Sequence, residues 1–105
     1  MTTPWTDLGN NVCGILHDRH DATAVTARFA RTGWRSRSSS WYGYEVETGW
    51  CRLEVDPVDG PDILLNGAVD PARLDDLAQL LTSFGFAYTL ELRDGNDTLV
   101  RELRG

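Results

Sequence analysis

The chain has 105 residues, of which 41% are hydrophobic, and both values are typical of one compact domain spanning residues 1–105. Its 16 acidic residues outnumber its 10 basic ones, for a formal net charge of −6. Because the acidic residues concentrate in 41–105, we expect that part to repel nucleic acid and acidic membranes. Without a signal-like opening or an apolar run long enough to span a membrane, a cytoplasmic location is expected.

Residues 4–16 carry apolar side chains at helical spacing, although glycines and asparagines weaken a helix there. We expect a short N-terminal helix. If it continued to residue 20, one stripe could offer three ligands to zinc, namely Cys13, His17 and His20. A new helix beginning at Asp21 would interrupt that stripe and leave a polar connector. The connector is favoured, and neither a metal nor any other cofactor is expected.

A helix is predicted to begin after Asp21, which can cap it, and to end at Gly33. Its buried stripe would consist of Ala22, Val25 and Phe29. The arginines of this helix, Arg28 and Arg31, would then face water.

The segment that follows this helix is rich in arginine, serine and tryptophan. With the helix arginines it could bind an anion or single-stranded nucleic acid by charge and stacking, through Arg28, Arg31, Trp34, Arg35 and Arg37. The acidic remainder of the chain would repel a polyanion at long range, so nucleic acid is an improbable partner. We favour an edge-strand extension whose arginines discourage sheet-to-sheet aggregation.

Residues 41–55, WYGYEVETGWCRLEV, alternate in a pattern typical of a β-hairpin. With Thr48-Gly49 as the turn, one face carries the apolar pairs Val46 with Cys51, Tyr44 with Leu53, and Tyr42 with Val55. The opposite face then pairs Glu45 with Arg52 and Glu47 with Trp50.

This register places two tryptophans on the sheet face that the helices leave open. The resulting candidate partner-binding residues are Trp41, Trp50, Glu45, Glu47, Arg52 and Glu54. Exposed tryptophan within a polar rim is typical of an interface anchor. Alternatively, the N-terminal segment could fold over this face and bury both rings.

A second helix is predicted after a short strand at residues 63–65 or slightly longer. Asp70 can cap this helix, Pro71 suits its first turn, and Gly85 would end it. The apolar spacing predicts a buried stripe made of Leu74, Leu77, Ala78, Leu81 and Phe84.

A second hairpin is predicted around a four-residue loop at 94–97. It would pair Leu92 with Leu99 and Tyr88 with Leu103. Because this register leaves Arg101 facing the core, a β-bulge could form there.

The expected elements give the order helix, helix, three strands, helix, two strands, which predicts an α+β fold. We expect a single antiparallel sheet of about five strands with two or three helices packed on one face. This order resembles that of secretion-chaperone-like and YbjN-like small domains. In addition, residues 12–34 align without a gap on 64–86, so the chain could contain an internal duplication of a helix-hairpin unit.

None of the common nucleophile, phosphate-binding, dinucleotide-binding or metalloprotease motifs is present, and we do not expect an enzyme. The function expected is that of a small acidic protein-binding module, of the inhibitor or immunity type or an adaptor or chaperone. It would use its exposed sheet face to engage a protein partner or a second copy of itself. The alternative is a small anionic-ligand or nucleic-acid-binding domain that uses the arginine and tryptophan cluster and could be enzymatic.

Overall fold

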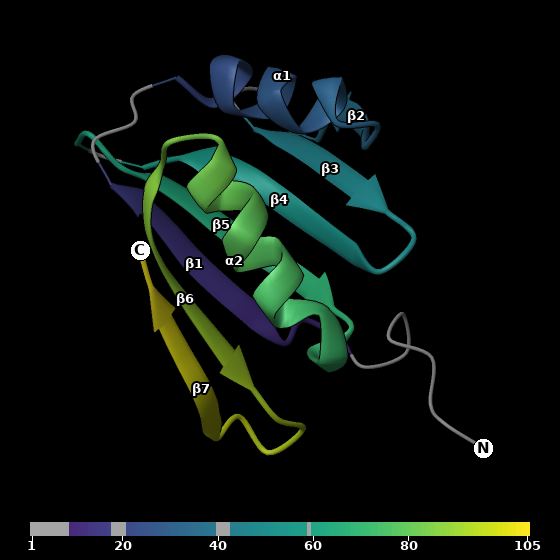
Figure 1. Ribbon diagram of the computed structural model, residues 1–105, viewed down its shortest axis with the longest axis vertical. Coiled ribbons are helices and arrows are strands. Elements are labelled where there is room, and N and C mark those ends of the chain that lie inside the picture. The colour runs from purple at the N-terminus through teal and green to yellow at the C-terminus, as the bar shows by residue number, and fades with distance from the viewer. Residues whose placement is uncertain (1–8, 18–20, 40–42, 59) are drawn as a thin grey trace.

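The computed structural model describes residues 9–17, 21–39, 43–58 and 60–105. Within them the chain forms an α+β fold with one antiparallel sheet and two α-helices (Figure 1). The elements in chain order are β1 Val12–His17, α1 Ala22–Arg31, β2 Arg35–Ser38, β3 Tyr44–Thr48, β4 Cys51–Pro57, β5 Ile63–Val69, the 3₁₀ helix η2 Pro71–Arg73, α2 Leu74–Ser83, β6 Ala87–Arg93 and β7 Leu99–Arg104. The 7 strands lie in the order β2-β3-β4-β5-β1-β6-β7, so the expectation of about five strands is corrected to seven.

The largest departure from the expected elements is β1, because residues predicted to be helical form a central strand. Their side chains alternate between buried and more exposed positions, as strand geometry requires. β1 pairs with β5 on one side and with β6 on the other. Its apolar residues fit a helical stripe and a strand face equally well, and ladder bonds from two neighbours favour the strand.

Helix α1 begins where it was predicted, whereas the predicted second helix is divided: its first turn is η2, and α2 begins only at Leu74. The Asp21 carboxylate accepts hydrogen bonds from the first backbone amides of α1, and the Asp70 carboxylate accepts one from the Ala72 amide at the start of η2. Just beyond the helices, Gly33 and Gly85 adopt φ values of +95° and +80°, which glycine reaches without strain. The predicted stripes are buried in both helices, at Ala22, Val25 and Phe29 and at Leu74, Leu77, Ala78, Leu81 and Phe84.

The first hairpin forms, but its turn is Gly49-Trp50 rather than Thr48-Gly49. Thr48 lies opposite Cys51, and Val46 lies opposite Leu53. The predicted pairing was therefore wrong by two residues. A shift of two keeps every strand side chain on its predicted face, so the apolar face survives, whereas Trp50 moves from a strand into the turn.

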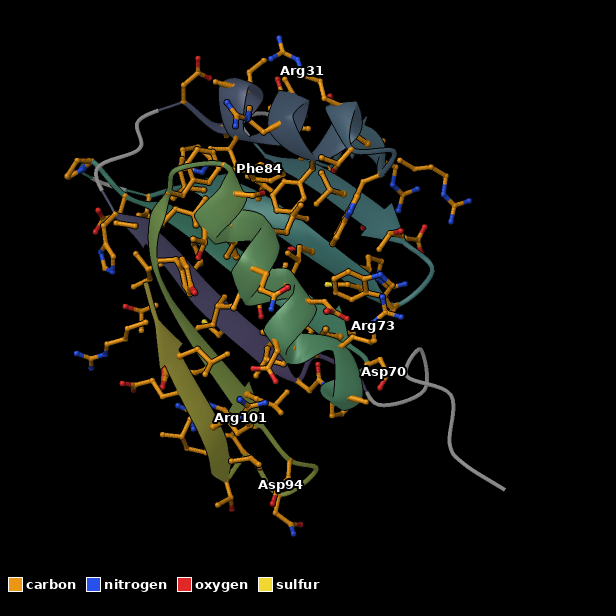
Figure 2. The ribbon with its side chains drawn as sticks, viewed as in Figure 1. Arg31, Asp70, Arg73, Phe84, Asp94 and Arg101 are labelled. Atoms are coloured by element: carbon orange, nitrogen blue, oxygen red, sulfur yellow. The ribbon has the colours of Figure 1, made fainter. Side chains whose placement is uncertain are left out.

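The second hairpin pairs two residues away from the prediction over most of its length, with Leu92 opposite Arg101 and Leu90 opposite Leu103. Leu99, predicted on the inner face, lies opposite Arg93 instead and is 45% exposed. An irregularity between Leu92 and Arg93 corresponds to the predicted bulge. Arg101 does lie on the helix side of the sheet, and its guanidinium reaches Asp75 of α2 at 2.9 Å (Figure 2). This partner explains how a charged side chain is accommodated there.

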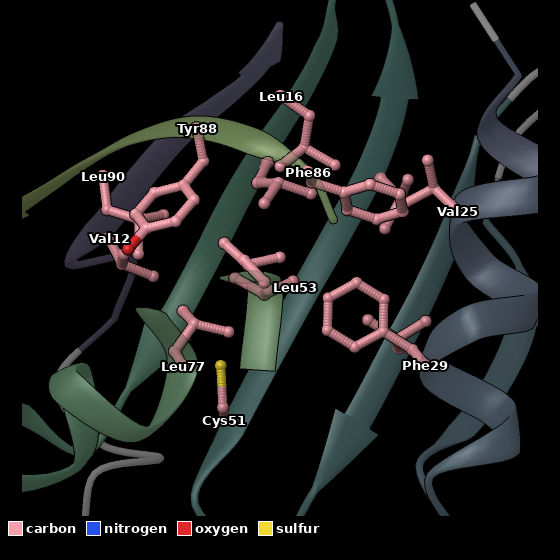
Figure 3. Close-up of a cluster of buried hydrophobic side chains, with 14 of the residues drawn as sticks. Val12, Leu16, Val25, Phe29, Cys51, Leu53, Leu77, Phe86, Tyr88 and Leu90 are labelled. Atoms are coloured by element: carbon pink, nitrogen blue, oxygen red, sulfur yellow. The ribbon is translucent and has the colours of Figure 1, made fainter. Parts of the chain in front are cut away.

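Both helices cover the same face of the sheet, here called the inner face (Figure 1). α1 packs against β2, β3 and β4, and α2 packs against β6. Side chains from both helices and from the central strands form one core, part of which Figure 3 shows between the sheet and the helices. No helix in the described part of the chain is long and apolar enough to cross a membrane.

The two aligned segments correspond to β1 with α1 and to β5 with α2, and the two helices coincide without a gap. The strands that follow them differ in position. β6, which follows α2, lies beside β1, whereas β2, which follows α1, lies at the sheet edge. The common origin of the two halves therefore stays a hypothesis.

Candidate docking face of the sheet

The sheet face opposite the two helices, here called the outer face, carries every glutamate of the chain. Side chains at directly opposed positions of an antiparallel sheet lie on the same face. The register therefore aligns four glutamates in one row across the sheet, in the order Glu45, Glu54, Asn66, Cys13, Glu91 and Glu102. The fifth, Glu47, lies two residues along β3 from Glu45 on the same face.

A small apolar strip lies next to this acidic row. Ile15 of β1 lies opposite Leu64 of β5, and 38% of its surface is exposed. Leu64 is half-buried, as is Cys13 in the neighbouring row. None of the described helices packs on these side chains, because both lie on the inner face. The outer face therefore combines an apolar centre with acidic flanks.

Arginines at both ends of the row hold most of its carboxylates. On β2, the Arg35 guanidinium lies 3.1 Å from Glu47 and that of Arg37 lies 2.9 Å from Glu45. At the opposite end, the same kind of pairing joins Arg93 to Glu91 and Arg104 to Glu102. Such exposed ion pairs contribute about 0–1 kcal/mol each, so a partner's charges can replace them at little cost.

Three charged side chains of the outer face, Arg52, Glu54 and Asp56, have no ion pair within the described residues. They occupy alternate positions along β4 and point away from the core. Arg52 lines an open hollow of about 590 Å³ with four other charged residues, Arg35, Arg37, Glu45 and Glu47. Sequence analysis placed Arg52 and Glu54 on this face and favoured an edge-strand extension where β2 forms the edge of the sheet. It missed the hollow because it did not predict how β2 pairs with β3.

The structure corrects the expected position of Trp50. Its ring lies on the inner side of the sheet, with its centroid 5.4 Å from that of Trp34 and the Arg73 guanidinium 4.9 Å above it. Trp50 is half-buried against the core. It is therefore not an anchor on the outer face. Trp41, the other predicted anchor, lies outside the described residues.

The alternative arginine and tryptophan cluster is not assembled as one site. Trp34 is only 7% exposed and packs on Phe29, so it cannot stack on a nucleic-acid base. Arg28 lies over the Phe84 ring on the helix side, and Arg31 is exposed on α1 (Figure 2). Only Arg35 and Arg37 come together on the outer face, where each is paired with a glutamate.

The zinc interpretation also fails for the residues that the structure describes. Because β1 is a strand, Cys13 and His17 lie about 13 Å apart along it, which is too far for a shared ion. The His17 Nε2 atom lies 3.0 Å from the Thr89 hydroxyl instead. His20 lies outside the described residues. No group of three metal-ligating side chains occurs in the described ranges.

The two thiols lie on opposite sides of the sheet. Cys51 is fully buried on the inner face, and burial raises the pKa of its thiol. Cys13 is half-buried at the middle of the acidic row. Cys13 thus provides a chemical reporter at the centre of the outer face.

Comparison of the chain with protein-family models, with curated proteins and with solved structures finds no match.

Proposed function

We propose that this chain is a small acidic protein-binding module, of the inhibitor, immunity, adaptor or chaperone kind, whose outer face docks a protein with a basic surface. It performs no catalysis in this proposal. The observation that carries it is the gathering of all five glutamates around the exposed Ile15 and the half-buried Leu64, on the face that neither described helix covers. An apolar centre within a polar rim is the usual composition of a protein interface.

The dimensions of the row favour a protein over a small molecule. From Glu45 on β3 to Glu102 on β7 the row crosses five strand spacings, or about 24 Å. A small ligand needs a concave site that buries most of its surface. A broad sheet with charges at both ends instead suits a protein of comparable width.

The charge of the chain favours a basic partner. A net charge of −6 accelerates the approach of a basic protein, and the free Glu54 beside the apolar strip offers it a contact. A second copy of the chain is less suited to this face, because like charges would meet across the contact. In this proposal the module acts in the cytoplasm, where its two free cysteines stay reduced.

The test begins with capture of partners from the native host by the wild-type chain, followed by affinity measurement with the purified partner. The variant Glu54→Arg combined with Glu102→Arg reverses two charges on the outer face. The control, Asp76→Arg, makes the same kind of change on α2, on the opposite side of the sheet. We expect the outer-face variant to lose at least tenfold in affinity and the control to bind like the wild type.

Cys13 supplies an independent measurement for the same complex. A partner seated on the outer face should slow alkylation of Cys13 by iodoacetamide, because it covers the centre of the acidic row. Unchanged Cys13 labelling in the complex, or equal affinities for the outer-face variant and the control, would contradict the proposal. If the wild-type chain dimerises and the outer-face variant does not, the occupant of the outer face is a second copy of the chain and not a basic partner.

A further inference from the structure

The hollow at the β2 end of the outer face differs in charge from the rest of the chain. Its charged lining consists of Arg35, Arg37, Arg52, Glu45 and Glu47. Three guanidinium groups face two carboxylates, which leaves one positive charge. On a chain with a net charge of −6, this hollow is therefore a local site of opposite sign.

The uncompensated charge can be assigned to Arg52. Glu45 is paired with Arg37 at 2.9 Å, and Glu47 is paired with Arg35 at 3.1 Å. Arg52 lies directly opposite Glu47 across β3 and β4, yet the Glu47 carboxylate is turned to Arg35. The described residues offer Arg52 no other ion pair, so its guanidinium is available to an outside anion.

We propose that this hollow binds one carboxylate group, held by the Arg52 guanidinium, and that in the docked complex this group is an aspartate or glutamate side chain of the partner. A planar carboxylate matches the two parallel N–H donors of an arginine. Its single negative charge balances the single excess positive charge of the hollow. A dianionic phosphate would in addition be repelled by the nearby Glu45 and Glu47.

The part of this inference that concerns the partner rests on the proposed function. In this arrangement the outer face carries charges of both signs. Its glutamates select basic groups of the partner, and Arg52 selects an acidic group. Alternating signs of this kind discriminate between partners, since a wrong match brings like charges together. A protein that is merely basic would satisfy the glutamates and leave Arg52 unpaired.

The carboxylate site can be tested without any partner. Acetate and, separately, inorganic phosphate are titrated into the labelled protein at constant ionic strength, and the Arg52 Nε–H and the amides of β3 and β4 are followed by NMR. We expect saturable shifts with acetate and weaker binding of phosphate. Non-saturating shifts with acetate, or tighter binding of phosphate, would overturn the assignment.

Variants locate the site within the hollow. Arg52→Gln should abolish the saturable response, and Arg52→Lys, which retains the charge but not the paired donors, should weaken it. Arg31→Gln is the matched control, because Arg31 is an exposed arginine on α1. Glu47→Gln should tighten acetate binding several-fold by removing a repelling charge. An acetate response that is unchanged in Arg52→Gln would exclude Arg52 as the binding group.

The two proposals can fail separately. If acetate binds at Arg52 but no protein docks on the outer face, the carboxylate site in the hollow is supported and the proposed function is contradicted. If a partner docks but binds Arg52→Gln as tightly as the wild type, the partner does not place an aspartate or glutamate in the hollow. The hollow would then bind only free carboxylates, and the assignment to the partner's side chain would be wrong. A loss of partner affinity at least fivefold greater for Arg52→Gln than for Arg31→Gln supports both.

Discussion

The indole ring of Trp50 packs edge to face on that of Trp34, with the ring centroids 5.4 Å apart and the ring planes at 80°. Trp34 in turn packs on Phe29 of α1, which is fully buried. The Arg73 guanidinium, which belongs to η2, lies over the Trp50 ring, 4.9 Å from its centroid. Trp50 therefore connects the β3–β4 turn to η2 directly and to α1 through Trp34, and its contribution is to stability.

Trp50→Ala should lower the free energy of unfolding by about 2 kcal/mol, because a half-buried ring and one aromatic pair are lost. Ile15→Ala, on the outer face, should change it by no more than about 0.5 kcal/mol. Urea denaturation measures both. Partner affinity should show the reverse order, with Ile15→Ala the more damaging variant. A Trp50→Ala protein of unchanged stability would contradict the packing described.

Gly67→Ala should be strongly destabilising. A Cβ at this position of β5 would lie 2.0 Å from the Arg52 carbonyl oxygen, which belongs to the backbone of the neighbouring strand and cannot rotate away. We expect a loss of about 3 kcal/mol or more, the cost of overpacking at a rigid site. Gly95→Ala is the matched control, since its Cβ would meet nothing within 4 Å. Thermal unfolding of the two variants gives the comparison, and equal melting temperatures would refute the close approach.

Asn11→Ala should cost about 2 kcal/mol or more, because it leaves two buried backbone groups without partners. The Asn11 side chain donates to the Val69 carbonyl and accepts from the Val69 amide, both at 2.9 Å. Asn10→Ala, one residue earlier and exposed, is the control. Chemical denaturation should separate the variants. Hydrogen exchange of the Val69 amide should also accelerate in Asn11→Ala alone.

Native-state alkylation should distinguish the two cysteines. Cys13 should react with iodoacetamide in the folded protein, and Cys51 should react only after unfolding, since it is buried and burial raises the pKa of its thiol. Mass spectrometry after digestion identifies the labelled residue. Rapid modification of Cys51 under native conditions would be incompatible with its position in the core.

The raised pKa of Cys51 also predicts a decline of stability in alkaline solution. The unfolded chain releases this proton near pH 8.5, whereas the folded chain retains it, so the unfolded state binds fewer protons above that pH. Cys51 should then lower the free energy of unfolding by about 1.4 kcal/mol per pH unit. Cys51→Val should lack this component when the two proteins are compared by urea denaturation between pH 8 and 10. Parallel pH profiles would show that Cys51 does not contribute.

The two helices, their caps and the inward face of the first hairpin could be predicted from the sequence, because they depend on neighbours within one or two turns of chain. Asp21 and Asp70 cap the residues that immediately follow them, and the apolar spacing of each helix specifies its buried side. Side-chain parity along β4 likewise follows from alternation alone. These properties depend on residues close together in the sequence, so the tertiary structure does not change them.

Only the tertiary structure decided the state of residues 12–17, the hairpin registers and the position of Trp50. Residues 12–17, a mixture of apolar and small residues, form a strand because β5 and β6 hydrogen-bond to it on both sides. The local sequence pattern does not indicate that these neighbouring strands are present. A two-residue change of register leaves every strand side chain on its face, so alternation could not exclude it, yet it transfers Trp50 from the outer face to a turn beside Trp34. The acidic row exists for the same reason, because it joins residues from strands far apart in sequence that only long-range pairing brings together. The Arg52 hollow lies on three consecutive strands, β2 to β4, and depends on the register in which they pair.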